Sequence, residues 1–362
     1  MKKFVFISSI ASPHQVKFCY ALRKYFDARF WFYASGDTDR ASWWKIDLGD
    51  KCEILSNVMF RNSGRYLCLG LWQKLNSFSP DIVMLGGFSI PGNYLGYLWA
   101  VRNRRKIVVF TERSRDKNGN MRKRSVIWRL IRMAYSRVDI VMTSAEDIVP
   151  QFRDELGFGN KVLAGRYAAD LDAYFSHSLR SKKIAYTYLF ANRLTKIYNP
   201  LGAIEIFSEI ANKYPGSRLL MNAAGELLPQ CKTEIEKLRL VESVEFLTCI
   251  KSWDELNKVY ARSDILLLPA FFSNGNFTIL EAMASGMCVI VSDEVSGIGK
   301  LIEDGRNGFR CKPVKEEFVE RINKCVDNPE LLINFAQINR QIASPFSMSG
   351  TAEFFKNIFG VS

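Results

Sequence analysis

The chain has 362 residues, more than one hydrophobic core usually supports, so its length predicts two domains. Its 48% hydrophobic and 24% charged residues are typical of a globular protein and exclude collagen-like or largely disordered chains. The net charge of +13 bears on association and solubility rather than on fold. No apolar run is long enough to span a bilayer, so we expect a cytoplasmic protein without a transmembrane helix.

Short apolar runs rich in β-branched residues alternate with helical patterns along the whole chain. This alternation is typical of parallel sheets with crossover helices, so the predicted fold class is α/β. The predicted strands of the first half cover residues 4–9, 28–33, 81–87, 106–111, 138–143 and 161–165. Those of the second half cover residues 185–191, 218–224, 244–247, 264–270 and 288–293, and beyond Phe309 we expect helices only.

A polar segment, SHSLRSKK at 176–183, separates the two groups of strands and is interpreted as the interdomain linker. We therefore expect one domain over residues 1–177 and a second over 178–345. The last stretch, 346–362, starts with helix-capping residue types and carries an apolar face, which predicts a C-terminal helix.

Ligands of open α/β sheets bind at the carboxyl ends of the strands, so the loops that follow the strands are where a site is expected. His14 opens the helix after the first strand, where it either packs as a structural residue or contacts a ligand. Glu112 and Arg113 follow the strand that ends at Thr111. They form either a surface ion pair or contacts to a substrate hydroxyl or phosphate group.

The segment from Arg102 to Arg137 is dense in Arg and Lys and contains two acidic residues. Its helical part, from about Met121, gathers apolar side chains beside Arg129 and Arg132. Such a helix suits an anionic membrane surface, so residues 113–137 are a candidate membrane contact. Alternatively, the apolar side belongs to the core and the arginines form a solvated face.

In the second domain, Arg193 and Lys196 lie between a strand and a helix, where cations and helix amide groups can neutralise a diphosphate. A Gly/Asn loop follows the strand at 264–270, and its N–H groups can turn toward an anion. Glu281 lies in the next helix among apolar neighbours, where a carboxylate needs hydroxyl or cationic partners. A ribose diol would supply such hydroxyls.

Several other classes of site are disfavoured. The eight cysteines show no C-x-x-C pair and the chain has two histidines, so no structural zinc site is expected. The lack of a D-x-D pair after a strand disfavours a required Mg²⁺ ion. No G-x-G-x-x-G follows a predicted strand, which disfavours a dinucleotide-dependent oxidoreductase.

Residues 269–290, PAFFSNGNFTILEAMASGMCVI, resemble the donor-domain hallmark of the GT-B glycosyltransferases of family 4, the glycosyl transferases group 1 type. Further parts that match the family pattern are RLTKIYN, AAGE at 223–226, VEFLT, EDGRNGF and, in the first half, AGRYAADLDAYF at 164–175. The resemblance implies the GT-B fold, in which two Rossmann-like domains face each other across a cleft. It also implies that the C-terminal helix packs back toward the first domain.

The resemblance implies a retaining glycosyltransferase that moves a sugar from a nucleotide-sugar to a saccharide or lipid-linked saccharide in bacterial surface polysaccharide assembly. The nucleotide-sugar is a substrate, so no cofactor is implied. Arg193 would bind the donor diphosphate, Glu281 the ribose hydroxyls, and His14, Glu112 and Arg113 the acceptor. The implied catalytic residues are His14, Arg193 and Glu281, and the implied donor-binding residues are Arg193, Lys196, Gly225, Glu226, Ser273, Asn274, Gly275, Asn276, Phe277, Thr278 and Glu281.

Three positions depart from the family pattern. Ser273 replaces the first glutamate of the family's E-x7-E pair, and SNGN replaces its EGFG loop. The family lysine falls on Tyr198, so Lys196 would supply the missing positive charge. These departures predict an active enzyme with an altered donor-sugar pocket.

The loop after the first strand, which carries His14, and the basic segment of the first domain, taken with the resemblance, predict a peripheral protein on the inner face of the cell membrane. One alternative is a sugar-nucleotide epimerase of the same fold. A second is a non-catalytic basic binding protein, although the sequence contains no recognised nucleic-acid module and we expect no nucleic-acid partner.

Overall fold

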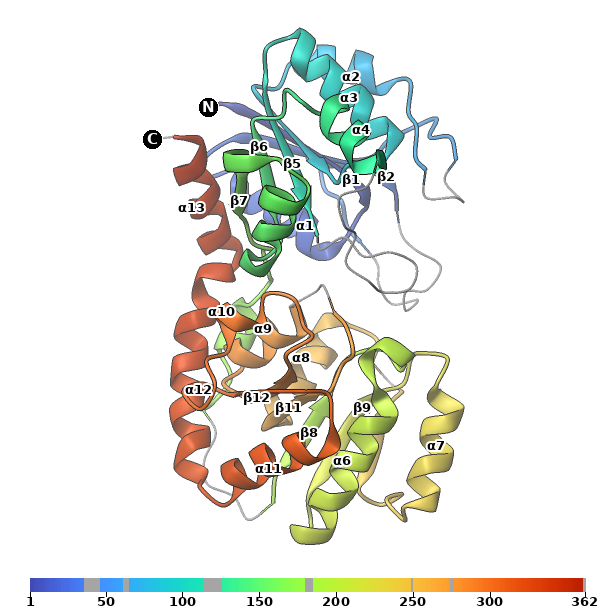
Figure 1. Cartoon of the computed structure of the whole chain (residues 1–362), viewed down its shortest axis with the longest axis vertical. Helices are drawn as coiled ribbons and strands as arrows, with labels where there is room; N and C mark the ends of the chain where they lie inside the picture. The colour runs from blue at the N-terminus through green and yellow to red at the C-terminus, as the bar shows by residue number, and fades with distance from the viewer. Residues whose placement is uncertain are drawn as a thin grey trace. The chain divides into compact units, whose positions relative to one another are not determined.

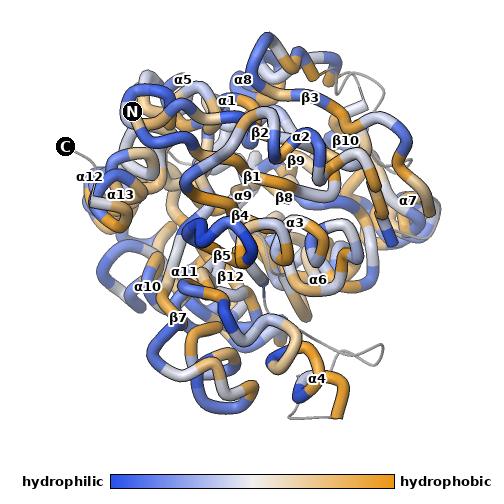
Figure 2. The backbone as a smooth tube through the Cα atoms, turned by 90° about the horizontal axis from the view of Figure 1, so that it is seen from above, coloured by the Kyte–Doolittle hydropathy of each residue, from blue (hydrophilic) through white to orange (hydrophobic). Residues whose placement is uncertain are grey.

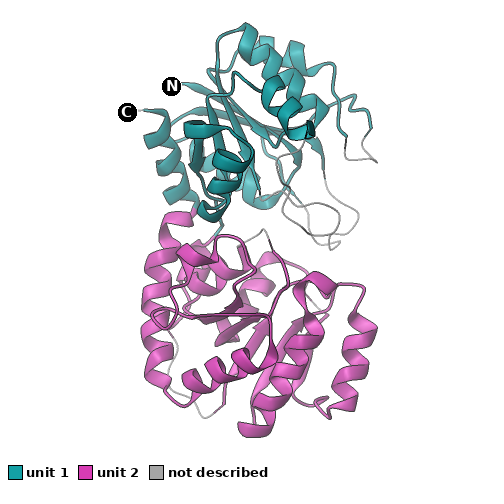
Figure 3. Cartoon of the chain, in the orientation of Figure 1, with its two compact units in different colours: residues 1–170, 348–362 teal, residues 171–347 magenta. Residues whose placement is uncertain are grey.

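The computed structural model describes residues 1–35, 46–60, 65–112, 126–179, 185–248, 250–273 and 277–360. The chain divides into two compact units, residues 1–170 with 348–362, and residues 171–347 (Figure 3). The first segment of unit 1 ends at Asp170, whereas the domain boundary predicted from the sequence follows residue 177. The physical reason is α5 (Asp172–Phe175), whose Tyr174 packs edge-on against Tyr260 of the second unit. Residues 180–183 of the predicted linker lie outside the described residues.

The first unit contains a parallel sheet (Figure 1), and its strand order is β3-β2-β1-β4-β5-β6-β7. Its strand order reverses between β1 and β4, which are neighbours. The edge strand β3 was not predicted, because its three residues, CEI, place a charged residue at the centre and form no apolar run. The strands are β1 (Lys3–Ile10), β2 (Asp27–Ala34), β3 (Cys52–Ile54), β4 (Ile82–Gly86), β5 (Lys106–Thr111), β6 (Ile140–Thr143) and β7 (Val162–Ala164).

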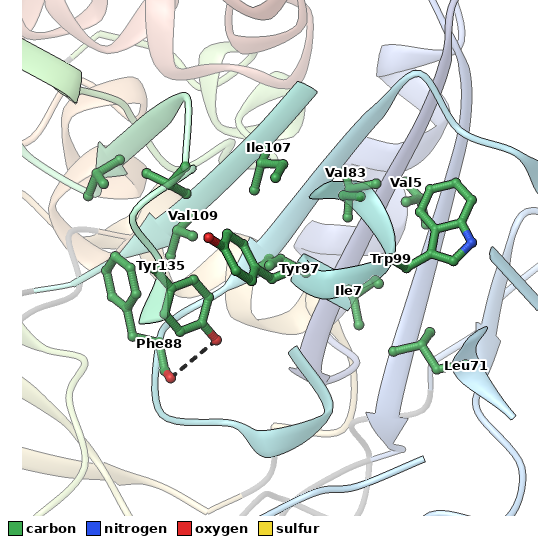
Figure 4. Packing of buried hydrophobic residues seen from close by; sticks show 14 of the residues in the cluster. Val5, Ile7, Leu71, Val83, Phe88, Tyr97, Trp99, Ile107, Val109 and Tyr135 are labelled. Carbon is green, nitrogen blue, oxygen red and sulfur yellow. Dashed lines mark hydrogen bonds between the residues drawn. The ribbon is translucent and has the colours of Figure 1, made fainter. Parts of the chain in front are cut away.

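Both faces of this sheet are covered by helices, which explains the nearly continuous apolar runs of its strands. Val5 and Ile7 of β1 pack with Trp99 on one face, as Figure 4 shows. Phe4 and Phe6 of the same strand join the other core cluster. The helices on the first face are α2 (Leu71–Phe78), α3 (Pro91–Arg102) and α4 (Val126–Ala134), and those on the second are α1 (Pro13–Leu22) and α13 (Met348–Phe359).

The end of the chain belongs to the first unit. Phe355 of α13 lies 5.2 Å from the ring of Phe18 in α1 and 6.1 Å from that of Phe4 in β1, measured between ring centroids. The Lys2 ammonium donates a hydrogen bond to the Phe359 carbonyl oxygen at 2.9 Å. These contacts join the two ends of the sequence in one hydrophobic core.

The second unit contains a parallel sheet with the order β10-β9-β8-β11-β12-β13. Its order reverses between β8 and β11, so both sheets are doubly wound in the Rossmann manner. This confirms the predicted α/β class with two Rossmann-like domains. The strands are β8 (Thr187–Phe190), β9 (Arg218–Asn222), β10 (Val244–Leu247), β11 (Ile265–Leu268), β12 (Cys288–Ser292) and β13 (Phe309–Cys311).

Strand β13 corrects the expectation of helices only beyond Phe309. Phe309 pairs with Ile290 in parallel register, and its side chain is buried. The preceding turn is fixed by the buried Asn307, whose amide donates to the Leu301 carbonyl and to the Asn339 side chain. The helices of this unit, besides α5, are α6 (Pro200–Lys213), α7 (Leu228–Lys237), α8 (Trp253–Arg262), α9 (Phe277–Ala284), α10 (Ile298–Leu301), α11 (Lys315–Val326) and α12 (Pro329–Ala343).

Candidate functional site

The strand order of the second unit reverses at β8 and β11, the point where doubly wound sheets bind their ligands. The loop after β8 carries Arg193 and Lys196. The segment after β11 runs through Ser273 to α9, which carries Glu281. Residues predicted from two separate motifs therefore follow the carboxyl ends of these two neighbouring strands.

Backbone hydrogen bonds hold the loop after β8 against the loop after β9. The Leu194 N–H donates to the Ala224 carbonyl at 2.7 Å, and the Leu227 N–H donates to the Leu194 carbonyl at 2.9 Å. Gly225 has φ +142°, and an added Cβ would lie 2.4 Å from the Leu194 carbonyl oxygen. Only glycine fits this approach, which brings Glu226 to the loop that holds Arg193.

The segment after β11 is anchored in the same way. The Ile197 carbonyl accepts a hydrogen bond from the Phe271 N–H at 2.8 Å. The Ser273 carbonyl accepts one from the Ser296 N–H at 2.9 Å, and the Ser273 side chain is buried. The loops after β8, β9 and β11 therefore form one connected surface at this edge of the sheet.

The two cations of the loop after β8 point to an anionic ligand. Arg193 and Lys196 are exposed, and neither side chain forms a hydrogen bond or an ion pair within the described ranges. In the same loop, the buried Asn192 Oδ1 and Thr195 Oγ1 atoms have no hydrogen-bond partner in that part of the chain. Asn192 and Thr195 lie on either side of Arg193 and Leu194, but they are not among the site residues predicted from the sequence.

Glu281 is the buried acid of the candidate site, with a side chain that is 5% exposed. The Tyr260 hydroxyl donates a hydrogen bond to Glu281 Oε2 at 2.6 Å. Burial raises the pKa of Tyr260 well above its usual range, and the charge of Glu281 raises it further, so this hydroxyl stays protonated and donates. Tyr260 therefore supplies one of the hydroxyl partners that the sequence predicts for the Glu281 carboxylate.

The remaining donor-side predictions lie at the start of α9. Phe277 and Thr278 are half-buried in its first turn. Asn274, Gly275 and Asn276, which precede that turn, lie outside the described residues.

In the first unit, His14 lies in the first turn of α1 at the strand-order reversal between β1 and β4. The helix is capped by Ser12, which accepts a hydrogen bond from the Gln15 N–H at 3.2 Å. The Asp170 N–H donates to His14 Nδ1 at 3.4 Å. A neutral His14 ring with Nδ1 as acceptor carries its proton on Nε2.

Glu112 follows β5 and accepts a hydrogen bond from the Tyr167 hydroxyl. Burial raises the pKa of Tyr167 well above its usual range, and the Glu112 charge adds to this effect. Arg113, the predicted ion-pair partner of Glu112, lies outside the described residues. Because β4 separates β1 from β5, His14 and Glu112 follow strands that are two positions apart.

Helix α4 exposes an apolar face. Its single buried residue, Trp128, packs against Phe88 with ring centroids 5.9 Å apart. Much of the helix has hydrophobic colouring in Figure 2. Four large apolar side chains on it are between 59% and 70% exposed: Val126, Ile127, Leu130 and Met133. The apolar residues of this helix are therefore largely outside the core.

The described part of the chain holds no group of three or more His, Cys, Asp or Glu side chains placed to bind a metal ion. None of its helices combines the length and the apolar character that crossing a bilayer requires.

Comparison with known sequences finds a family model that matches most of the second unit. Residues 175–342 match the family model of the glycosyl transferases group 1. An uncharacterized glycosyltransferase of Haemophilus influenzae is 26% identical over 156 residues, which are 43% of this chain and 43% of that protein. An alpha-D-kanosaminyltransferase of Streptomyces kanamyceticus is 23% identical over 264 residues, covering 72% of this chain and 61% of that protein.

Comparison with solved structures shows the same fold over the whole chain. HepE of Anabaena, solved in complex with UDP, has a TM-score of 0.76 at 15% identity, with 99% of both chains covered. The pneumococcal O-GlcNAc transferase GtfA, solved with UDP and GlcNAc, has a TM-score of 0.73 at 12% identity, also with 99% of both chains covered.

Proposed function

We propose that the protein is a retaining glycosyltransferase, because residues 175–342 match the family model of the glycosyl transferases group 1 and the chain has the GT-B fold. It moves a sugar from a nucleotide-sugar to a saccharide or lipid-linked saccharide, in the assembly of a bacterial surface polysaccharide. The observation that carries the proposal is that two exposed cations, Arg193 and Lys196, and the buried Glu281 follow the two neighbouring strands at which the sheet order reverses.

The chemistry of this site follows from the leaving group. A nucleoside diphosphate departs with developing negative charge, so the main catalytic task is to stabilise that charge with cations and oriented N–H groups. Arg193 and Lys196 supply the cations, and the first turn of α9 supplies N–H groups. The carboxylate of Glu281 accepts hydrogen bonds from the ribose hydroxyls. No side chain is assigned as a nucleophile.

The acceptor is assigned to the first unit. With Nδ1 occupied by the Asp170 N–H, the neutral His14 ring presents an Nε2–H donor, which orients an acceptor hydroxyl by donating to its oxygen. Glu112 accepts a hydrogen bond from the Tyr167 hydroxyl. We assign its carboxylate as the group that takes the proton from the hydroxyl of the sugar acceptor.

Nucleotide binding tests the donor site directly. Thermal and urea unfolding of the purified chain should show stabilisation by one of the diphosphates ADP, CDP, GDP and UDP. A ligand at 100 times its Kd adds about 2.7 kcal/mol to the free energy of unfolding. If none of the four stabilises the chain, the donor-site assignment is wrong. Conversion of a nucleotide-sugar to its epimer without an acceptor would identify the epimerase alternative.

The exposed face of α4 supports a second proposal, that the chain binds an anionic membrane surface on the inner side of the cell membrane. Val126, Ile127, Leu130 and Met133 supply apolar area, and exposed Arg129 and Arg137 flank it. Apolar side chains next to arginines suit the boundary between acyl chains and anionic headgroups. The basic residues predicted at 113–125 lie outside the described residues.

Cosedimentation with vesicles tests this surface. Wild-type protein should pellet with phosphatidylcholine vesicles that contain phosphatidylserine, and Leu130→Glu should reduce the bound fraction about tenfold, because it removes apolar contact and adds a repelled charge. Leu69→Glu is the matched control, since Leu69 is also exposed in the first unit and lies outside α4. Equal binding by wild type and Leu130→Glu would contradict the proposal.

A further inference from the structure

We infer that Tyr260 is a positioning residue for the ribose contact, because its hydroxyl donates a hydrogen bond to one carboxylate oxygen of Glu281 and so orients the carboxylate. The inference rests on the proposed function, which assigns Glu281 to the ribose. It goes further by naming the side chain that orients this carboxylate. Tyr260 lies 21 residues from Glu281 in sequence, on α8 rather than α9.

The first step is the geometry of the Glu281 carboxylate. Glu281 Oε2 accepts the Tyr260 hydroxyl at 2.6 Å, a short distance typical of a hydrogen bond to a charged acceptor. The hydrogen bond fixes the carboxylate about its last side-chain torsion, which is otherwise broad. A vicinal diol needs an acceptor in a fixed orientation, so this restraint lowers the entropy lost on binding.

The second step is the restraint on Tyr260 itself. Its ring is almost completely buried and meets Tyr174 of α5 edge-on, with centroids 5.2 Å apart and an interplanar angle of 86°. This burial and ring contact hold the Tyr260 hydroxyl in place to donate to Glu281.

Burial alone does not explain this arrangement. Tyr188 of β8 is also fully buried, yet its hydroxyl has no hydrogen-bond partner among the residues that the structure describes. The fold therefore tolerates a buried tyrosine hydroxyl without a carboxylate. Tyr188→Phe supplies a control with the same chemical change in the same unit.

The experiment measures ribose recognition rather than stability alone. Calorimetry would give Kd values for ADP, CDP, GDP and UDP and for the 2′-deoxy form of each. Wild type should prefer the ribose form of its nucleotide about 10- to 100-fold, as expected for a hydrogen bond to a charged group. In Tyr260→Phe this ratio should fall about tenfold, while kcat at saturating donor changes less than about threefold, since the phosphate contacts remain.

Three controls separate the outcomes. Tyr188→Phe should keep the wild-type ratio, and circular dichroism should show that Tyr260→Phe is folded. If Glu281→Ala loses the preference for ribose but Tyr260→Phe keeps it, the positioning role is wrong and the proposed donor site stands. If Glu281→Ala also keeps the preference, Glu281 does not contact the ribose and both assignments fall.

Discussion

Replacing Arg193 with alanine is expected to lower kcat/KM for the nucleotide-sugar about 10²- to 10³-fold, the range found when one donor to a developing charge is removed. Arg193 lies after β8 at the point where the strand order reverses, and in the described residues its guanidinium has no internal partner to be disrupted. The change should therefore leave the ligand-free stability nearly unaltered. Steady-state transfer rates and urea unfolding measure the two effects.

The control for Arg193→Ala is Arg218→Ala, because Arg218 is also exposed but starts β9 at the opposite, amino end of the sheet. Arg218→Ala should keep wild-type rates. Arg193→Lys should recover part of the lost activity, since lysine restores the charge without the two-pronged geometry of a guanidinium. A wild-type preference for nucleoside diphosphate over monophosphate in Arg193→Ala would show that this arginine does not bind the diphosphate.

Most of the parallel sheets could be predicted from sequence, because buried parallel strands are long apolar runs. The predicted strands at 106–111 and 244–247 match β5 and β10, and the others overlap their strands with differences at the ends. The strands β3 and β13 were missed because their sequences, CEI and FRC, each place a charged residue at the centre and form no apolar run. The edge strand β7 is equally short but apolar throughout, VLA, and it was predicted.

Whether the apolar face of α4 is buried in the core or exposed to solvent could not be predicted from the sequence. The spacing of apolar residues in α4 indicates one hydrophobic face, yet the same pattern fits a core helix and a surface helix. The structure buries Trp128 and exposes Leu130 and Met133. What decides between the two orientations is the position of the sheet and of Phe88, which come from distant parts of the sequence.

The candidate donor site was predicted only where its residues belong to local motifs. Arg193, Lys196 and Glu281 each stand out by their position after a strand or inside an apolar helix. Tyr260 gives no such signal, because its contact with Glu281 depends on how α8 and α9 pack in the second unit. Side chains that position a site residue from a neighbouring helix become visible only in three dimensions.

Glu281→Ala is expected to lower the affinity for the ribonucleoside diphosphate about 10- to 100-fold, because two ribose hydroxyls lose a charged acceptor. The same change affects the ligand-free protein through Tyr260, whose buried hydroxyl loses its acceptor. An unsatisfied buried donor costs about 1–3 kcal/mol, whereas removing both partners is nearly neutral. Adding Tyr260→Phe to Glu281→Ala should therefore raise the free energy of unfolding, measured with urea, without restoring the nucleotide affinity, measured by calorimetry.

The double variant Tyr260→Phe with Glu281→Ala should be more stable than Glu281→Ala alone by about 1 kcal/mol or more, and should bind nucleotide no better. Tyr188→Phe with Glu281→Ala should show additive changes, since Tyr188 does not contact Glu281 within the described chain. Additivity in the Tyr260 cycle would mean that the hydrogen bond contributes little to the free energy of unfolding. A coupled cycle would instead mean that Glu281 is held ready for its ligand by the ligand-free fold.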